Sequence, residues 1–407
     1  MVNVIGLGYI GLPTALMLAS HGVEVVGTDY NKELVESLNA GIPTFKEDGL
    51  DELFKNAVDA GIKFTNNYQH TDIYIVAVPT PYNKFSKKVD ACYVKAAVND
   101  VLDVCNAGAT IIVESTVSPG TIDKEVRPLI AERGFITGKD VHLVHAPERI
   151  LPGNMIYELI NNDRTIGADE PNVAVRVRDI YASFCKGEIV LTDIRTAEMT
   201  KVVENTFRAV NIAFANELSR ICRHDNMDVY EIIRICNKHP RVNIMNPGPG
   251  VGGHCISVDP WFLVGDYPQL TKVIGESMKV NDSQPDFVLE RLQVIMQENN
   301  IKDASRVGLY GITYKENVDD YRDSPTLQLL ESQARHLAAP LKCYDPFLEN
   351  MKLTESQYSD FEAFINDVDI VVVMVKHDHI CHNWDRLKDK IVLDCHNICP
   401  LPNTYRL

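Results

Sequence analysis

A cysteine stands at the end of the most glycine-rich segment of the chain, where a nucleophile could act. The segment at 247–254 reads PGPGVGGH, and Cys255 follows it directly. Glycine loses more conformational freedom on folding than other residues, so such a run is typical of backbone that packs closely around a ligand. Most cysteines are small buried hydrophobic residues, and only the thiolate form is a strong nucleophile. The setting, with Asp259 four residues further on, favours Cys255 over the other cysteines as a candidate nucleophile.

A second group of polar residues repeats at helical spacing. Lys201, Asn205 and Arg208 are separated by four and then three residues, which puts them on one face of a helix. A cation and an amide on such a face could stabilise an anion that develops during a reaction. Glu198 and Glu204 flank the group, however, and a solvated helix face produces the same spacing. For this helix by itself, the solvated face is the favoured interpretation.

The N-terminal segment has the pattern of a dinucleotide site. Gly6, Gly8 and Gly11 fit GxGxxG between an apolar run and an apolar helix, and Asp29 ends the next expected strand. The glycines let the backbone approach a pyrophosphate at the helix N-terminus, where N–H groups and the helix dipole favour negative charge. A carboxylate at Asp29 accepts hydrogen bonds from ribose hydroxyls and repels a 2′-phosphate. The motif therefore predicts NAD rather than NADP.

Three further loops follow expected strands, at the edge where such sheets bind ligands. The first contains Thr80 between two prolines, and the second contains Thr116 within residues 115–121. Both offer hydroxyls to a cofactor, although these are also ordinary turn sequences, and the turn interpretation is favoured for either loop alone. The third loop carries Glu148 and Arg149. For this pair, catalysis and an exposed ion pair are alternatives.

Strands and helices alternate around these residues. Helical patterns separate short apolar runs that predict strands at 2–5, 23–28, 73–78, 110–114 and 142–145. A long amphipathic pattern with few breakers follows at 196–223, and further helical stretches come after it. Apolar runs then predict a second set of strands at 306–310, 341–344, 370–375 and 391–393.

This order of elements predicts an α/β fold with two Rossmann-like, doubly wound domains joined by a helical middle segment. The expected domains are an NAD-binding domain at 1–194, a central helical domain at 195–300 and a C-terminal α/β domain at 301–407.

Composition argues against several classes of partner. With 40 Lys and Arg against 56 Asp and Glu, the formal net charge is −16, which disfavours nucleic acid and anionic membranes. An anionic substrate would therefore need a local basic pocket. The ten cysteines are scattered, no signal peptide precedes the first strand, and no run approaches roughly 18 apolar residues. We expect a cytoplasmic protein with reduced thiols and no membrane span.

A group of histidines and cysteines near the C-terminus raises the question of a metal. It comprises His377, His379, Cys381, His382, Cys395, His396 and Cys399. The residue types suit zinc, but their spacing matches no paired structural-zinc pattern. We expect no metal site.

Seven segments together indicate a family. They are GLGYIGLP at 6–13, VPTP at 78–81, ESTVSPGT at 114–121, APERILPG at 146–153, EMTKVVENTFRAVNIAFANEL at 198–218, PGPGVGGHCISVDPWF at 247–262 and GITYKENVDDYRDSP at 311–325. In this order, and nearly from end to end, they resemble the UDP-glucose/GDP-mannose dehydrogenase family. Within it, RTAEM at 195–199 and KHPRVNI at 238–244 are most similar to members that act on UDP-N-acetyl-D-mannosamine. Members that act on UDP-N-acetylglucosamine or UDP-glucose are the alternatives.

The resemblance implies ligand-binding roles for two sets of residues. The NAD set corresponds to Gly6, Gly8, Tyr9, Ile10, Gly11, Asp29, Thr80, Thr116 and Arg322. The UDP-sugar set corresponds to Arg149, Ile150, Lys201, Asn205, Arg208, His239, Arg241, Gly252, Tyr314 and Lys315. It also implies a homodimer or higher homo-oligomer built on the helical middle segment, in which Arg241 reaches a neighbouring subunit's site.

The resemblance further implies a reaction, the four-electron oxidation of a sugar C6 alcohol to a carboxylate for surface polysaccharide precursors. Cys255 would form a thiohemiacetal and then a thioester with the substrate. Lys201 and Asn205 would stabilise an alkoxide, and Glu148 would orient or deprotonate water. Asp259 would hold Lys201 or the water in position.

The chain departs from the family at one position. Relatives have a D-x-K/R pattern near the C-terminus, where this chain reads Asp394-Cys395-His396. Neutral histidine donates one hydrogen bond and is fully charged only below about pH 6.5. This chain therefore has no permanent cation at a position where relatives have one.

Two other classes of protein share some of these features. A hydroxyacid or phosphogluconate-type dehydrogenase shares a Rossmann domain and a helical middle segment, but it gives Cys255 no role. A non-catalytic NAD-sensing protein would have no need of Lys201, Asn205, Glu148 and Cys255 together.

Overall fold

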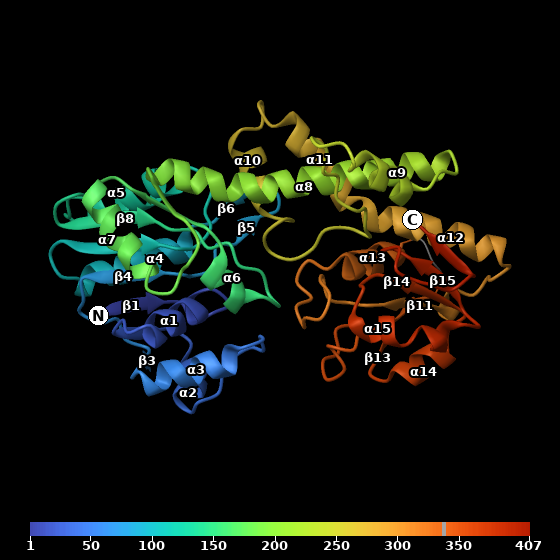
Figure 1. Cartoon of the computed structure of the whole chain (residues 1–407), viewed down its shortest axis with the longest axis horizontal. Helices are drawn as coiled ribbons and strands as arrows, with labels where there is room; N and C mark the ends of the chain where they lie inside the picture. Colours follow the sequence, from blue (N-terminus) through green and yellow to red (C-terminus); the bar gives the residue numbers. More distant parts are fainter. Residues whose placement is uncertain (336–338) are drawn as a thin grey trace. The chain divides into compact units, whose positions relative to one another are not determined.

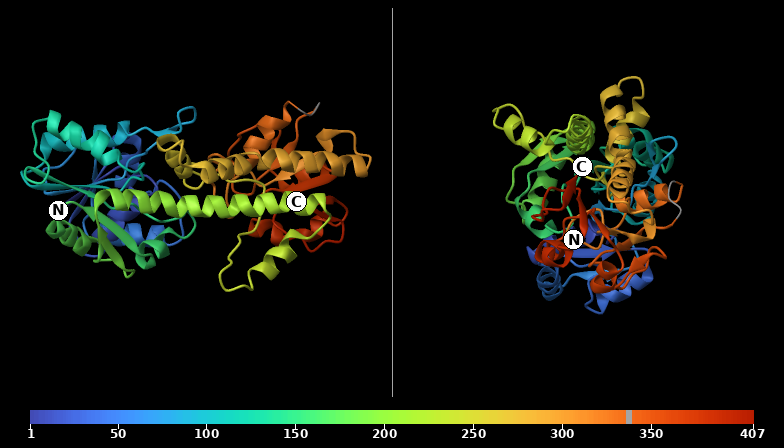
Figure 2. Two further views of the ribbon diagram at one scale, coloured as in Figure 1. Left: turned by 90° about the horizontal axis from the view of Figure 1, so that it is seen from above. Right: turned by 90° about the vertical axis from the view of Figure 1, so that its right-hand side faces the viewer.

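The computed structural model describes residues 1–335 and 339–407. They form two compact units, Met1–Glu204 and Asn205–Leu407, each with its own main sheet (Figure 1). Helix α8 (Ile194–His224) is continuous over 31 residues and contains the end of the first unit and the start of the second (Figure 2).

The first unit is built on an eight-stranded sheet with the order β10-β9-β8-β7-β4-β1-β2-β3. Its strands are β1 (Val2–Ile5), β2 (Val25–Thr28), β3 (Lys63–Thr65), β4 (Ile73–Val76), β7 (Ala109–Val113), β8 (Val141–His145), β9 (Arg164–Ala168) and β10 (Ile189–Thr192). Ile5 is in register with both Thr28 and Val76, so the carboxyl ends of the central strands meet at one edge. The loops that follow these strands can therefore share a ligand site.

One pairing in this sheet differs from the expected all-parallel arrangement. Strand β9 is antiparallel to β8, and β10 is parallel to β9. An antiparallel edge is common on otherwise parallel sheets because a returning strand can pair at the edge without a full crossover. The consequence is that the first residue of β9, Arg164, lies at the same edge as the loop that follows β8.

Helices cover both faces of the first sheet. One face packs against α1 (Gly11–Ser20), α2 (Lys32–Asn39), α3 (Leu50–Asp59), α6 (Met155–Asn161) and α7 (Pro171–Tyr181). The other packs against α4 (Cys92–Val104), a π-helix (Ile122–Val126) and α5 (Arg127–Glu132). A small hairpin, β5 (Tyr82–Asn83) and β6 (Lys88–Val89), completes the unit. Burial on both faces explains why the strands read as continuous apolar runs rather than as alternating ones.

The second unit begins with helices and ends with a six-stranded parallel sheet. Its first helices after α8 are α9 (Val229–Cys236), α10 (Asp259–Asp266), α11 (Lys272–Asp282) and α12 (Gln284–Glu298). The sheet has the order β13-β12-β11-β14-β15-β16. Its strands are β11 (Val307–Tyr310), β12 (Lys342–Tyr344), β13 (Gln357–Tyr358), β14 (Ile370–Val373), β15 (Ile391–Asp394) and β16 (Thr404–Arg406).

Both faces of the second sheet are also covered (Figure 1). Helix α12 and helix α13 (Pro325–Gln333) pack on one face, while α14 (Phe361–Asn366) and α15 (Asp378–His382) pack on the other. The predicted fold of two doubly wound α/β units with a helical middle segment is thus confirmed. The expected strands occur within a few residues of their predicted positions.

All ten cysteines have free thiols. Within residues 1–335 and 339–407, every helix is too short or too polar to cross a bilayer.

Candidate active site

The turn after β1 has the geometry of a pyrophosphate cradle. Gly6 has a φ of +86°, and a Cβ there would lie 2.6 Å from the Ala77 carbonyl oxygen. A Cβ on Gly11 would lie 1.8 Å from the Gly6 oxygen, whereas one on Gly8 would meet no atom within 4 Å. Gly6 and Gly11 are therefore required by the protein's own packing. Gly8 instead leaves open the space that a side chain would fill and that a pyrophosphate needs.

Asp29, directly after β2, is fixed beside this turn. Its carboxylate accepts hydrogen bonds from the backbone N–H of Leu7 at 2.8 Å and of Asn31 at 2.9 Å. Each carboxylate oxygen has a further lone pair for a ribose hydroxyl. At the same turn, the ring of Tyr9 packs on Phe45 with centroids 4.5 Å apart, and Ile10 precedes α1. The residues present fit NAD.

The next two loops are joined to each other. The Thr80 hydroxyl donates to the Thr116 carbonyl oxygen at 2.7 Å, and the Ser115 hydroxyl donates to the Val78 oxygen at 2.7 Å. The structure therefore brings together two segments that the sequence offered separately. Both follow strands adjacent to β1 or to its neighbour, as a cofactor-binding role requires.

Glu148 does not form an exposed ion pair with Arg149, which is the alternative to a catalytic role for these two residues. Its side chain is buried, and one carboxylate oxygen forms an ion pair with Nη2 of Arg164, which is also buried. The other oxygen accepts a hydrogen bond from the Arg149 backbone N–H at 2.6 Å. Arg164 was missed in the sequence because it lies sixteen residues away, on a strand whose antiparallel direction was not expected.

Arg149 has different partners. Its guanidinium pairs with Glu204 at 2.8 Å and donates to the Thr165 hydroxyl at 2.7 Å. It remains partly exposed, whereas the neighbouring Ile150 is buried in the core. Arg149 is thus held beside Glu148 by contacts of its own.

The solvated interpretation of the helix face was wrong. Lys201 and Asn205 are only 7% and 6% exposed, and Glu198 is fully buried. Glu198 accepts hydrogen bonds from the backbone N–H groups of Gly120 at 2.5 Å and Ile122 at 2.9 Å. Burial raises the pKa of Glu198 to about 7, against the opposing effect of these two donors. The sequence could not show this burial, because residues at helical spacing share one face whether that face is solvated or packed against the rest of the protein.

In the second unit, Asn205 is tied to the segment that carries the cysteine. Its amide nitrogen donates to the Asp259 carboxylate at 2.7 Å, and Asp259 is 3% exposed. The Asp259 backbone N–H donates to the Cys255 carbonyl oxygen at 2.8 Å, in the turn that leads into α10. Cys255 itself is half-buried. One hydrogen bond thus joins α8 to the turn that begins at the candidate nucleophile.

The glycines before Cys255 have a packing reason. A Cβ on Gly252 would lie 2.7 Å from the Tyr314 Cβ, and one on Gly253 would lie 2.8 Å from the Tyr314 ring. Gly253 has a φ of +80°, and its N–H donates to the Arg322 carbonyl oxygen at 2.9 Å. The close approach expected around a ligand is therefore made, at these two positions, to segment 311–325 of the protein itself.

That segment is fixed by a buried pair that sequence reasoning missed. Asp345 and His377 are both inaccessible to solvent, and Nε2 of His377 lies 3.2 Å from the Asp345 carboxylate. The same carboxylate accepts from the backbone N–H groups of Ile312 and Thr313 at 2.6 and 2.9 Å. Asn317 donates its backbone N–H to Nδ1 of His377 at 2.9 Å. These bonds fix the loop from both sides of Tyr314 and Lys315.

Other predicted ligand residues lie elsewhere in the second unit. Arg322 forms a two-point contact with Asp320, at 2.8 and 2.5 Å. Arg208 is half-buried on α8, while His239 and Arg241 are exposed in the loop that follows α9. The exposure of Arg241 is compatible with the expected contact to a neighbouring subunit.

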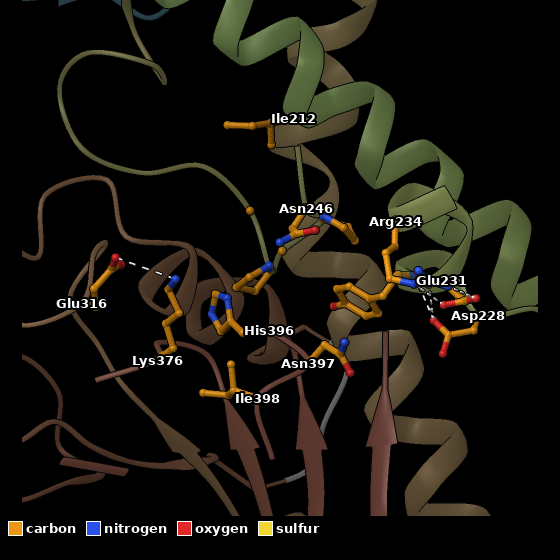
Figure 3. Close-up of a pocket in the computed structure, with 15 residues that line it drawn as sticks. Ile212, Asp228, Glu231, Arg234, Asn246, Glu316, Lys376, His396, Asn397 and Ile398 are labelled. Atoms are coloured by element: carbon orange, nitrogen blue, oxygen red, sulfur yellow. Dashed lines mark hydrogen bonds and ion pairs between the residues drawn. The ribbon is translucent and has the colours of Figure 1, made fainter. Parts of the chain in front are cut away.

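A cavity of about 780 Å³ opens between the segment 246–250 and the carboxyl ends of β14 and β15 (Figure 3). Its charged lining residues are Asp228, Glu231, Arg234, Glu316 and Lys376. Lys376 lies 3.9 Å from Glu316, whereas Arg234 pairs with Glu231 at 2.6 Å. The cavity therefore contains cationic groups despite the acidic balance of the chain.

His396, at the position of the family's basic residue, also lines this cavity. Its Nε2 lies 2.9 Å from the Met374 carbonyl oxygen, which can only accept, so this nitrogen carries the proton. Burial lowers the pKa of His396, and the ring is therefore neutral at pH 7, with Nδ1 as an acceptor. His396 therefore carries no positive charge at pH 7 at the position where relatives have a basic residue.

Two of the histidines considered for zinc have other partners. His377 contacts Asp345, and His379 contacts the Tyr310 hydroxyl at 3.0 Å. Within the described parts of the chain, no three His, Cys, Asp or Glu side chains gather in a way that could hold a metal ion.

The cradle after β1, with the acidic residue after β2, defines the class of protein: it is a protein with an NAD-binding Rossmann domain. Comparison with known proteins agrees. Three domain profiles of the UDP-glucose/GDP-mannose dehydrogenase family match the chain: the NAD binding domain at 1–185, the central domain at 195–283 and the UDP binding domain at 308–400.

Full-length relatives match as well. UDP-N-acetyl-D-mannosamine dehydrogenase of Methanocaldococcus jannaschii is 40% identical over 98% of this chain and 92% of its own. NDP-N-acetyl-D-galactosaminuronic acid dehydrogenase of Ralstonia nicotianae is 38% identical over 97% and 95%. The structure of UDP-N-acetyl-mannosamine dehydrogenase from Staphylococcus aureus superimposes with a TM-score of 0.88 at 37% identity, covering 100% of this chain and 98% of that one. The chain belongs to the UDP-glucose/GDP-mannose dehydrogenase family.

Proposed function

We propose that the protein oxidises the C6 alcohol of a UDP-N-acetylhexosamine to the uronic acid, with UDP-N-acetyl-D-mannosamine as the substrate and surface polysaccharide synthesis as the use of the product. UDP-N-acetylglucosamine and UDP-glucose are the alternatives. An N-acetylhexosamine is common to the names of the relatives in M. jannaschii and R. nicotianae, which supports this substrate class. The cytoplasmic location expected from the sequence is part of the proposal.

One observation supports the proposed type of reaction. It is the buried hydrogen bond from the Asn205 amide to the carboxylate of Asp259, which lies in the turn that begins at Cys255. Asn205 follows the buried Lys201 by one helical turn. An ammonium and an amide held in this way can stabilise an alkoxide at C6 without reorganising as charge develops. Bound NAD would accept one hydride from the sugar in each of two successive oxidations.

Cys255 would retain the substrate between the two oxidations. Its thiolate adds to the aldehyde carbon, and the resulting thiohemiacetal loses a hydride to become a thioester. Water then adds to the acyl carbon as the C–S bond breaks, which releases the carboxylate and the thiol. Glu148 is proposed to orient or deprotonate that water, and Asp259 to hold Asn205 and Lys201 in place.

The groups proposed to bind the nucleotide part of the substrate belong to the second unit, except for Arg149 of the first unit. Lys315, on the loop fixed by Asp345 and His377, would contact the diphosphate together with Arg149 and Arg241. The cavity beside His396 has space and a cation, Lys376, for the remaining nucleotide. Lys315→Ala should then raise the KM for the UDP-sugar more than the KM for NAD.

A homodimer is part of the proposal. Exposed apolar side chains follow α8 at intervals of four and seven residues: Val203, Phe207, Phe214 and Ile221. Phe207 and Phe214 are 65% and 51% exposed, which is costly for an unpartnered helix and typical of a helix–helix contact. Phe207→Glu should lower the mass measured by light scattering to that of a monomer.

The reaction is tested with Cys255→Ser. Acid formation should fall by about 1,000-fold, because serine is not activated at a site built for a thiolate. Cys236→Ser, at an exposed cysteine outside the proposed site, is the matched control and should behave like the wild type.

The substrate is tested by measuring NADH production with UDP-N-acetylmannosamine, UDP-N-acetylglucosamine, UDP-glucose and GDP-mannose. The proposal expects two NADH per acid formed and the highest kcat/KM with the first sugar. Uronate production by Cys255→Ser at the wild-type rate, or one NADH per product, would overturn the scheme.

A further inference from the structure

Three charged side chains are buried together in the first unit. Glu114 follows β7, Glu148 lies in the loop after β8, and Arg164 is the first residue of β9. They are 1%, 6% and 3% exposed. The cost of removing a charge from water is so high that a buried cluster of this kind must be paired internally.

Arg164 is held on all sides. Its Nη2 pairs with the Glu148 carboxylate, and its Nη1 lies 3.5 Å from Glu114. The guanidinium carbon lies 4.3 Å from the centroid of the ring of Tyr181, the last residue of α7, and 5.6 Å from that of Phe184, which follows this helix. The aromatic contacts and the two carboxylates leave the guanidinium little freedom to move.

One guanidinium faces two carboxylates, so the charges are not equivalent. Burial raises the pKa of Glu114, against the opposing effects of Arg164 and of the Tyr181 hydroxyl, which donates to Glu114 at 3.1 Å. Glu114 therefore retains a proton more readily than an ordinary glutamate. The positive charge of Arg164 is left to balance Glu148.

The other titratable groups near Glu148 do not balance its negative charge. Arg149 directs its guanidinium to Glu204 and Thr165 and gives Glu148 only its backbone N–H. His145, on β8, is fully buried, and burial lowers its pKa to about 4, so its ring is neutral at pH 7. Among the contacts that Glu148 makes within the described residues, Arg164 supplies the cation.

We propose that Arg164 is a positioning residue that fixes both the orientation and the negative charge of Glu148, so that Glu148 can align the water that hydrolyses the Cys255 thioester. This inference rests on the proposed function and adds to it a residue that positions the proposed base. In the hydrolytic step, the water oxygen bonds to the acyl carbon and the C–S bond breaks. One water proton passes to Glu148 and then to the departing Cys255 thiolate, and no electrons are exchanged.

The test uses Arg164→Gln and Arg164→Lys in the full chain, with Arg176→Lys on the exposed surface of α7 as the matched control. Thioester hydrolysis is followed by intact mass and by rapid quench, and the first hydride transfer is followed as the NADH burst. Arg164→Gln should slow hydrolysis by about 100-fold, the range of a positioned acid–base group, and should accumulate acyl-enzyme. The burst should change by less than about 3-fold, because Arg164 has no part in that step.

The pH profile separates positioning from a purely structural role. Without the guanidinium, Glu148 should hold its proton to higher pH, so the acid limb of the hydrolysis profile should move upward in Arg164→Gln. Arg164→Lys retains a charge and should give a smaller displacement. If both variants fold as judged by NAD binding but have the wild-type hydrolysis rate and acid limb, the inference is overturned.

A double-mutant cycle provides the second measurement. If Arg164 acts through Glu148, then Arg164→Gln should add less than about 3-fold to the hydrolysis defect of Glu148→Gln. Independent, multiplying defects would contradict the proposal. The failure of the underlying scheme has a different signature: the wild type would form no adduct on Cys255, whatever residue stands at position 164.

Discussion

The two sheets of this protein share a local design and differ in what occupies it. Gly6 and Gly311 follow β1 and β11, the first strand of each sheet along the chain, and have positive φ values of +86° and +92°. The backbone N–H of Gly6 donates to the carbonyl oxygen of Thr28 at 2.8 Å, and that of Gly311 donates to the carbonyl oxygen of Tyr344, also at 2.8 Å. Thr28 and Tyr344 are the last residues of the neighbouring strands β2 and β12. An aspartate follows each of these neighbouring strands, Asp29 after β2 and Asp345 after β12. Asp29 accepts a hydrogen bond from the turn after β1, and Asp345 accepts one from the turn after β11.

The difference begins at the next residues. In the first unit, α1 starts at Gly11, five residues beyond Gly6, so that a helix N-terminus faces the turn. In the second unit, α13 does not begin until Pro325. Asp29 keeps some exposure, whereas Asp345 is sealed by His377 and has none. The second edge therefore lacks both the helix terminus and the open carboxylate that a dinucleotide requires.

A doubly wound topology supplies only the position of a site, and the side chains at the sheet edge decide how that site is used. Asp29 is available to a ligand, while Asp345 holds the protein's own loop around Tyr314 and Lys315. The same type of residue serves binding in one unit and loop geometry in the other.

The largest expected effect comes from removing the sealed carboxylate. Asp345→Ala should lower the free energy of unfolding by about 3–5 kcal/mol, because His377 and two backbone N–H groups lose a buried acceptor. Denaturant unfolding measures it. Asp29→Ala is the comparison and should cost about 1 kcal/mol, since water can replace the carboxylate there. Equal costs at the two positions would break the distinction drawn between them.

The open glycine gives the next largest effect. Gly8→Val should weaken NAD binding by about 100-fold, equivalent to the loss of ~3 kcal/mol of charged hydrogen bonds, without destabilising the fold. Titration of NAD binding by calorimetry measures it. Gly311→Ala, which places a Cβ 2.5 Å from that of Val375, should instead destabilise the second unit and spare NAD affinity. Normal NAD binding by Gly8→Val would contradict the assignment of this turn as the binding site of the NAD pyrophosphate.

The two units should respond to pH in opposite directions. Burial raises the folded pKa of Glu198 from 4.5 to about 7, so the folded state binds the extra proton and loses stability as pH rises across that interval. Burial alone would raise the pKa of Asp345, but the His377 contact and the backbone donors lower it on balance. Its contribution is present above the ordinary pKa of 3.8 and is lost as pH falls through the lower folded value.

Hydrogen exchange, read separately in each unit, checks this prediction. The free energy of unfolding of the first unit should fall by about 2 kcal/mol between pH 4.5 and 7, and Glu198→Gln should remove this pH dependence. The second unit should lose protection only below about pH 4, and Asp345→Asn should flatten its acid response. A first unit whose protection is constant from pH 4.5 to 7 would contradict the sign given for Glu198.

The smallest effect concerns cofactor choice. Asp29→Ser should reduce the preference for NAD over NADP by about 10-fold, because the carboxylate no longer repels a 2′-phosphate. Steady-state kcat/KM with each cofactor measures this ratio. Asn66→Ala is the control: its amide donates to the Asp29 backbone oxygen at 2.8 Å and leaves the carboxylate unchanged, so the ratio should stay at the wild-type value.

Sequence reasoning found the features that are written in short stretches of chain. The GxGxxG turn, the apolar strands and the long helix α8 each depend on neighbouring residues, and each occurs close to its predicted place. It did not find that β9 returns antiparallel, and so it could not pair Arg164 with Glu148. It also favoured a solvated face for Lys201, because helical spacing shows which residues share a face but not what covers that face.

The positions of the strands along the chain, the cradle for NAD and the cysteine at the end of a glycine-rich loop were determined by the sequence itself, through backbone freedom and apolar periodicity that act over a few residues. Which charges meet was decided by tertiary structure alone. Arg164 with Glu148, Asn205 with Asp259 and His377 with Asp345 are pairs that only folding brings together. The physical reason is that a buried charge or amide must find a partner wherever the fold supplies one, and that partner has no fixed distance along the chain.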